Sequence, residues 1–243
     1  MKNRCFEMTS CLLAAFSFGA TAFAAPLQRA DVPANPAWVV HVDVDAIRPT
    51  AVGQFLLGEM AKPESKAKIS VLQSLIGVDL TTQLHGLTLY NTGTDTKDGV
   101  LIVYADFDPE KLSNLAQVAK DPRSAKHHGI TIRSWVDEKK SEEGKEKRTY
   151  GAIKGNRVVL GQQESTVAAA LDVLDGGSSL AGSKNFPQLG AADSPKCIQA
   201  AAHHLDLPGN DPHAAMLKLA QGMRLDIGEA DGKVKATLAL EAK

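Results

Sequence analysis

The sequence predicts an α+β fold, with helices packed on one face of a largely antiparallel sheet. Short segments in which apolar and polar residues alternate recur along the chain, and turn-forming residues separate them. Helical spacing is confined to a few stretches between these segments. The last two segments are apolar on one side only, which is typical of a sheet covered on one face. The chain has 243 residues, 44% hydrophobic and 23% charged, and so suits a globular protein.

Residues 1–24 have the three parts of a secretory signal peptide. Lys2 and Arg4 are positive, an apolar stretch follows at 12–20, and Ala22-Phe23-Ala24 places small residues before a cleavage point. The apolar stretch is shorter than the roughly 20 residues that cross a bilayer, so cleavage is favoured over a membrane anchor. We therefore expect an exported protein, periplasmic or secreted, with no transmembrane segment in its mature part.

Charge and cysteine content narrow the class of protein. The full chain has 27 basic and 28 acidic residues. This balance gives no strong basic field, so no nucleic-acid partner is expected. Cys5 and Cys11 leave with the signal peptide, and only Cys197 remains. One thiol forms no internal disulfide, so the mature fold depends on its hydrophobic core.

Residues 25–36 are predicted to be an exposed segment rich in Pro and Ala, and residues 37–243 a single domain. The first strand is predicted at 37–46, where apolar and polar side chains alternate. The residues of its predicted dry face are Trp38, Val40, Val42 and Val44. Those of its predicted wet face are His41, Asp43 and Asp45.

Two helices are predicted next, at 50–61 and 63–76. The second begins with a proline, which fits the first helical position, and Gly77 is a natural stop. Strands are predicted at 85–91 and 99–107. The loop between them is dense in turn residues, so the two strands are expected to pair in an antiparallel manner.

Asp108 and Pro109 open a third helix, because aspartate caps the first turn and proline fits it. Its predicted inward residues are Leu112, Leu115, Ala116 and Ala119. A strand at 128–136 then leads into the charged stretch 137–148. This stretch contains no apolar residue and is predicted to be a solvated hairpin tip.

The second half of the chain continues the same pattern. Its predicted elements are strands at 149–154 and 157–162, a helix at 164–174, a strand at 196–205, a helix opened by Asp211-Pro212, and a closing hairpin. The hairpin turns at Asp231-Gly232. Its predicted dry face consists of Met223, Leu225, Ile227, Val234, Ala236, Leu238 and Leu240. The similar order of elements in 37–148 and 149–243 raises the hypothesis of a duplicated split β-α-β unit.

Two groups of residues are candidates for a metal site. His41, Asp43 and Asp45 would project from one face of the first strand at intervals of roughly 7 Å, and their side chains are of the types that bind zinc or another transition metal. The competing interpretation is an ordinary wet sheet face, where polar residues must alternate with the valines. The second candidate pair is His204 and His213, with other histidines and aspartates around them.

Familiar catalytic signatures are absent from the sequence. It contains no G-x-S-x-G, H-E-x-x-H, C-x-x-C or G-x-G-x-x-G motif. Cys197 stands in an apolar strand pattern, where a lone thiol is typical of a small core residue. The sequence therefore predicts no catalytic residue and no cofactor, and a role other than catalysis is favoured.

Several stretches resemble a group of exported bacterial α+β proteins of unknown function. The resemblance is carried by Val32–Ile47 with the following Thr50–Leu56, and by the segments 84–90, 103–108 and 168–175. It covers most of the mature chain, and its motifs are structural rather than catalytic. It implies export and an α+β fold, and it transfers no activity and no site residues.

These observations favour an exported, non-enzymatic binding or structural domain of the cell envelope. Its partner would be an envelope protein, a lipid or a polysaccharide. One alternative is a metal-binding protein or metal-dependent hydrolase that uses the His and Asp clusters. A second alternative is a carrier of an apolar ligand.

Overall fold

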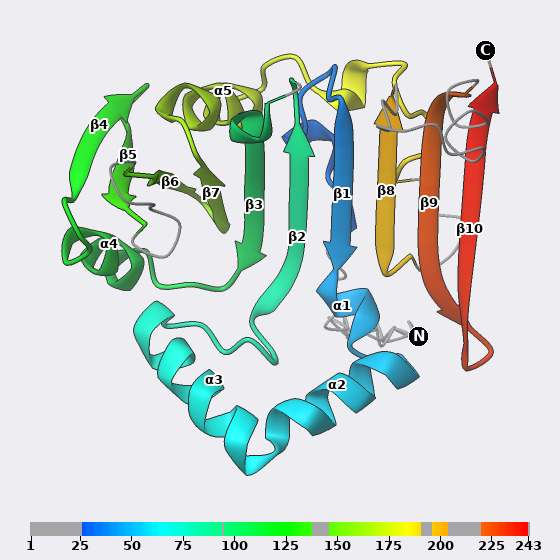
Figure 1. The fold of residues 1–243 in the computed structure, drawn as a ribbon, viewed down its shortest axis with the longest axis horizontal. Helices are drawn as coiled ribbons and strands as arrows, with labels where there is room; N and C mark the ends of the chain where they lie inside the picture. The colour runs from blue at the N-terminus through cyan, green and yellow to red at the C-terminus, as the bar shows by residue number, and fades with distance from the viewer. Residues whose placement is uncertain (1–25, 94, 138–145, 191–195, 204–219, 243) are drawn as a thin grey trace, which may run out of the picture.

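Ten strands form one antiparallel sheet in the computed structural model, which describes residues 26–93, 95–137, 146–190, 196–203 and 220–242 (Figure 1). The strands are β1 (Trp38–Asp43), β2 (Leu84–Asn91), β3 (Gly99–Ala105), β4 (Arg123–His127), β5 (Ile130–Val136), β6 (Arg148–Lys154), β7 (Arg157–Gly161), β8 (Ile198–His203), β9 (Ala220–Ala230) and β10 (Lys233–Ala242). Their order across the sheet is β10-β9-β8-β1-β2-β3-β7-β6-β5-β4. The predicted α+β class and antiparallel sheet are confirmed.

Five α-helices accompany the sheet in the described part of the chain. They are α1 (Val44–Ile47), α2 (Ala51–Ala61), α3 (Pro63–Ile76), α4 (Pro109–Gln117) and α5 (Glu164–Leu174). Local chemistry sets several of their ends, as the sequence predicts. The Asp108 carboxylate accepts hydrogen bonds from the backbone N–H groups of Glu110 and Lys111 at the start of α4. Gly77 ends α3 with φ 72°, the left-handed conformation that favours glycine.

The main core lies on one face of the sheet. There the register aligns Val39 with Tyr90 and Tyr90 with Val100 across the central strands. The helix α5 covers this face with Val167 and Leu171, together with two short 3-10 turns, η1 (Arg29–Asp31) and η3 (Leu180–Gly182). The one-face arrangement thus holds for α5, whereas α4 packs against the opposite face of β5 to β7.

The predicted faces of β1 are corrected by the structure. His41 is 1% exposed and Asp43 is 4% exposed, because their face carries the core together with Val39. The face of Trp38, Val40 and Val42 is only half-buried. His41 and Asp43 are tolerated in the core because each has a hydrogen-bond partner there, Thr88 for His41 and the backbone N–H of Ala46 for Asp43. The strand also ends earlier than predicted, since Asp43 accepts a hydrogen bond from the backbone N–H of Ala46 and starts α1.

The segment before β1 is not exposed as predicted. Leu27 and Val32 belong to the core. Arg29 donates hydrogen bonds to five backbone carbonyl groups between Leu180 and Leu189, which fastens this segment beneath the loop after α5. The Pro- and Ala-rich composition of residues 25–36 predicted an exposed segment, but Leu27 and Val32 anchor this segment in the core.

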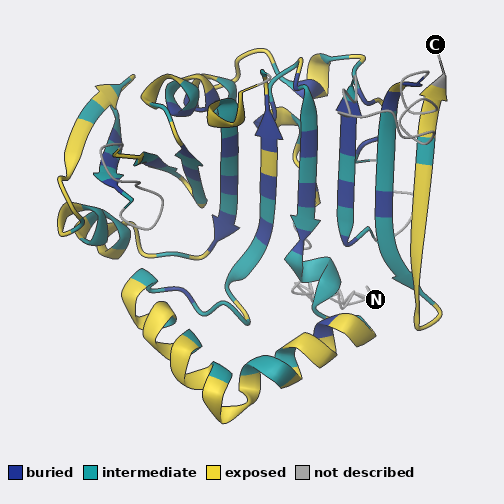
Figure 2. Cartoon of the chain, in the orientation of Figure 1, coloured by how far each residue is buried: buried dark blue, intermediate teal, exposed yellow. Residues whose placement is uncertain are grey.

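The hairpin of β9 and β10 forms as predicted, but its apolar face is not dry. Val234, Leu238 and Leu240 are exposed, and Leu225 is only half-buried. Figure 2 shows that β10 is exposed along most of its length, as are α2 and α3. β10 is the edge strand, and the apolar side of this hairpin is the face opposite the main core. The prediction that the apolar face of this hairpin is dry was wrong, because that face points away from the main core at the edge of the sheet.

One strand is missing from the sequence prediction. β4 consists of Arg-Ser-Ala-Lys-His and pairs with β5 at the other edge of the sheet. It has no alternation of apolar residues that would have predicted it. The signal peptide, most of the charged tip at 137–148, and the helix predicted from Asp211 lie outside the described residues.

The two predicted halves are interleaved in the sheet. β7 and β8, from the second half, pair with β3 and β1 on either side of the first three strands. The duplicated unit stays a prediction. Among the described residues, no helix combines the length and the apolar character needed to cross a membrane.

Candidate functional site

A cavity of about 510 Å³ lies between α4 and the face of the sheet opposite the main core. Side chains from α3, α4 and the strands β5, β6 and β7 surround it. Its lining residues are Ile76, Leu112, Ser113, Leu115, Ala116, Val118, Ala119, Arg133, Trp135, Gly151, Ala152, Ile153, Val158 and Leu160. This cavity is the candidate site and is called the α4 pocket below.

The floor of the α4 pocket is built by strand register. Gly151 lies opposite Leu160, and Ile153 lies opposite Val158, so these residues face the same side of the sheet. Gly151 also makes room for aromatic packing. A Cβ atom on it would lie 3.0 Å from Leu160 Cδ2 and 3.3 Å from Trp135 Cη2. The missing side chain therefore lets the Trp135 ring lie close over the floor.

The roof of the pocket comes from α4 and the two residues that follow it. Leu112, Leu115, Ala116 and Ala119, which the sequence predicts to point inward, all line the cavity. Two of these are alanines, whose small side chains leave space above the sheet. α4 is thus amphipathic, but its apolar side covers the sheet without filling the volume beneath it.

The end of α3 closes one side of the pocket. Ile76 is the last residue of α3 and lines the cavity. Gly77 follows it, and a Cβ atom there would lie 2.8 Å from Lys111 Cδ of α4. The glycine therefore ends α3 and leaves room for the Lys111 side chain of α4, which any larger residue at this position would displace.

Two side chains in the lining are polar, Ser113 and Arg133. The Arg133 guanidinium makes no hydrogen bond or ion pair with the part of the chain that the structure describes. Among the described residues, no carboxylate, histidine or cysteine lines the cavity. The arrangement suits apolar contact with a ligand, plus one charge-assisted contact with an anionic group. The Ser113 hydroxyl has no general base beside it among the described lining residues.

The first predicted metal candidates are placed apart from the pocket and from one another. His41 Nδ1 lies 2.9 Å from Thr88 Oγ1 in the core. Asp43 caps α1, while Asp45 lies within α1, where the strand pattern no longer applies. Asp45 accepts a hydrogen bond from Arg48 over 2.5 Å, and its other oxygen lies 2.9 Å from His85 Nδ1. The ligand atoms of His41, Asp43 and Asp45 do not form a close group in the structure.

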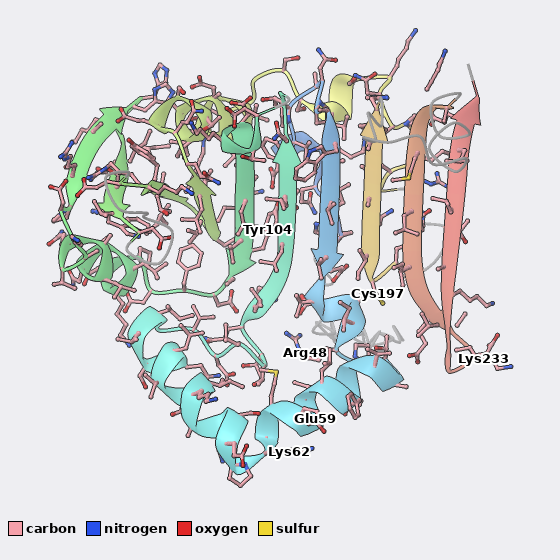
Figure 3. All side chains as sticks on the ribbon, viewed as in Figure 1. Arg48, Glu59, Lys62, Tyr104, Cys197 and Lys233 are labelled. Carbon is pink, nitrogen blue, oxygen red and sulfur yellow. The ribbon has the colours of Figure 1, made fainter. Side chains whose placement is uncertain are left out.

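His85 links two carboxylates at the foot of the sheet. Its Nδ1 contacts Asp45 and its Nε2 lies 3.1 Å from Asp106 Oδ2. Partial burial lowers the pKa of His85, but the hydrogen bonds and charges of Asp106 and Asp45 outweigh it, so the pKa is raised overall. Figure 3 shows Arg48 beside α1, below the end of β1.

His204 and His213, the second predicted metal pair, lie outside the described residues. Among the residues that the structure describes, one group of three His, Cys, Asp or Glu side chains has closely spaced ligand atoms, formed by His127, His128 and Asp172. It lies at the turn between β4 and β5, on the face that α5 covers.

The sequence carried one signal for the pocket floor that the strand predictions did not use. Val158, Val159 and Leu160 form a continuous apolar run in β7. Such a run is typical of a strand with both faces covered, rather than one covered face and one wet face. In the structure Val159 enters the core while Val158 and Leu160 line the pocket.

No protein-family model matches the chain, and no curated protein does. Two solved structures are similar in fold, crystal form III and crystal form IV of TP0453. They align with TM-scores of 0.50 and 0.51 at 14% sequence identity. Each alignment covers 90% of this chain, and 80% and 81% of the respective TP0453 chain. At this identity the likeness concerns the fold alone.

Proposed function

We propose that this chain is an exported, non-enzymatic protein of the cell envelope that binds an apolar ligand with one acidic group, of the fatty-acid class, in the α4 pocket. The observation that carries the proposal is an apolar cavity of about 510 Å³ in which Arg133 is the one cationic side chain among the described lining residues. Export rests on the signal-peptide pattern of residues 1–24.

The size and lining of the pocket support a ligand. Small-molecule sites typically have volumes of roughly 300 to 1,000 Å³ and a mostly apolar lining with few polar groups. Water inside such a lining makes few hydrogen bonds, so its displacement by hydrocarbon is favourable. A mature core that was selected only for stability would be expected to close such a space.

Arg133 supports the choice of an acidic ligand. Its side chain lines the cavity and has no partner in the described part of the chain. A carboxylate head would supply that partner through a charge-assisted hydrogen bond, worth roughly 1.5 to 3 kcal/mol. The hydrocarbon tail would then lie between α4 and the floor of Trp135, Val158 and Leu160.

The pocket lining favours binding over catalysis, because its described residues provide no acid–base pair and no base beside the Ser113 hydroxyl. The metal-dependent hydrolase alternative remains a prediction for His204 and His213. For His41, Asp43 and Asp45 it receives little support, since His41 and Asp43 are buried and Asp45 is paired with Arg48.

The test uses the full chain purified from its exporting host. Native mass spectrometry and lipid extraction are expected to reveal a bound amphiphile. After delipidation, a fluorescent fatty acid should bind, and the fatty alcohol of equal length should bind more weakly. Arg133→Gln should weaken the binding of the fatty acid by roughly tenfold or more and leave the binding of the fatty alcohol unchanged.

Matched variants on α4 locate the ligand. Ala116→Phe fills the cavity and should abolish binding while the melting temperature stays the same or rises. Asn114→Phe adds the same ring on the exposed side of α4 and should leave binding intact. The proposal is overturned if no lipid is extracted and neither probe binds, or if Ala116→Phe binds as the wild type does. A protein or polysaccharide partner would then take its place.

A further inference from the structure

His127, His128 and Asp172 bring three ligand atoms together on the face of the sheet opposite the α4 pocket. His127 Nε2 lies 2.6 Å from Asp172 Oδ1, and His128 Nε2 lies 3.6 Å from the same oxygen. One ligand atom from each of the three residues lies within 4.8 Å of the other two. The group joins the end of β4 to the helix α5.

Backbone geometry explains why two consecutive histidines point to one place. Neighbouring side chains in a strand project to opposite faces. Here β4 ends at His127, and the two turn residues have positive φ, 46° at His128 and 83° at Gly129. Such a turn is the two-residue hairpin type that matches strand twist. It brings the two imidazole rings to a centroid separation of 4.3 Å.

Asp172 is presented to this turn by α5. The core residues Val167 and Leu171 fix α5 on the sheet, and Asp172 follows on its exposed side. The position of the carboxylate is thus set by packing and not by the histidines alone. A third ligand from a separate, rigid element is what distinguishes this group from two adjacent surface histidines.

The spacing fits a metal ion after small side-chain shifts. Zinc binds histidine nitrogen and carboxylate oxygen at about 2.0–2.2 Å, so the ligand atoms of a tetrahedral site lie about 3.3 Å apart. The observed separations of 2.6 Å and 3.6 Å bracket that value. A simple ion pair would need one histidine, whereas two imidazoles directed at one carboxylate oxygen match the donors of a divalent transition metal.

We infer that His127, His128 and Asp172 bind one divalent ion of the zinc, copper or nickel class. His128 and Asp172 are exposed, so the ion is reached directly from solvent and keeps at least one position for water. The site bridges β4 and α5, and binding therefore fastens an edge strand with few apolar contacts to the core helix. It is independent of the α4 pocket.

The test is calorimetric titration of the untagged full chain with zinc chloride after chelator treatment. One ion per chain is expected. Copper(II) added to the same protein should give an electron paramagnetic resonance spectrum with nitrogen splitting from two imidazoles.

Variants assign the ligands. His128→Asn places at this turn another residue that tolerates positive φ. His128→Asn and Asp172→Asn, each made separately, should weaken zinc binding at least tenfold. His85→Ala removes another half-exposed, carboxylate-paired histidine and should leave zinc binding unchanged. The inference is overturned if no zinc binds at about 1 mM, a concentration that would fill even a loose site. It is also overturned if His128→Asn and Asp172→Asn each bind zinc as the wild type does. A double variant, His204→Ala with His213→Ala, that abolishes zinc binding would overturn it too.

Discussion

The Tyr104 hydroxyl donates a hydrogen bond to Asp31 Oδ2 over 3.0 Å, which joins the centre of the sheet to the turn that precedes the first strand. Arg157 Nε donates to the same oxygen over 2.7 Å. Behind Tyr104 the chain of contacts continues through Thr88 to His41. Figure 3 shows Tyr104 on β3, in the middle of the sheet. Burial and then the Asp31 charge raise the pKa of Tyr104, so the phenol stays neutral and donates.

Substitution of Asp31 should therefore destabilise the fold. Asp31 is 4% exposed, and Asp31→Ala leaves the buried Tyr104 hydroxyl without its acceptor and Arg157 without its counter-charge. We expect a loss of about 2–4 kcal/mol in the free energy of unfolding, measured by urea denaturation. Glu64→Ala, at an exposed position of α3, should change it by less than about 0.5 kcal/mol.

Tyr104→Phe is the milder test of the same contact. It removes the donor but leaves the Arg157–Asp31 ion pair in place, so the expected loss is about 1 kcal/mol. If Asp31→Ala proves no more destabilising than Tyr104→Phe, Asp31 is not the acceptor that holds the turn to the sheet.

The His85 bridge should make stability depend on pH. Its pKa is raised in the folded protein from an ordinary value of 6.5. A raised folded-state pKa means that the stabilisation is fully present below the unfolded-state pKa and is lost as the pH rises through the folded-state pKa. We expect the difference in unfolding free energy between wild type and His85→Gln to be larger at pH 6 than at pH 9.

A second variant separates the two carboxylates. Asp106→Asn keeps the contact between His85 and Asp45. Its difference in unfolding free energy from the wild type should follow the same pH trend as that of His85→Gln, with a smaller amplitude. Urea denaturation at both pH values measures each difference. A difference that does not vary with pH for His85→Gln would mean that the bridge contributes nothing to stability.

The sequence predicts most elements of the fold because local signals set them. The bounds of α5 agree with the predicted 164–174, where Ala and Val give way to two glycines. It cannot predict which face of β1 is buried, because that depends on partners far along the chain. His41 is tolerated in the core only since Thr88, 47 residues away, supplies a hydrogen-bond partner.

The candidate sites show the same division. The inward side of α4 follows from helical spacing, whereas the space beneath it depends on the register that aligns Gly151 with Leu160. The His127–His128 pair is visible in the sequence, but Asp172 is 44 residues beyond His128, and only tertiary packing brings it near. β4 itself could not be predicted, since an exposed edge strand needs no apolar residues.

Processing at the predicted signal peptide is directly measurable. Small residues at Ala22 and Ala24 are required by the signal peptidase, so intact-mass spectrometry of the exported protein should place the mature amino terminus at Ala25. Ala24→Asp should leave the precursor uncleaved, while Thr21→Ala should be processed normally. A mature chain that retains residues 1–24 would favour a membrane anchor instead.

Two glycines of α2 should respond to alanine with opposite signs. At Gly53 a Cβ atom would lie 2.0 Å from the backbone oxygen of Ile47 and 2.9 Å from that of Arg48, since α2 starts directly against the end of α1. Backbone atoms cannot rotate away, so Gly53→Ala should destabilise the protein by at least about 2 kcal/mol. At Gly58 nothing lies within 4 Å, and Gly58→Ala should stabilise it by about 0.5–1 kcal/mol, because alanine loses less entropy in a helix. Thermal and urea denaturation of both variants measure the contrast, and a stabilising Gly53→Ala would show that α2 does not pack on α1 in solution.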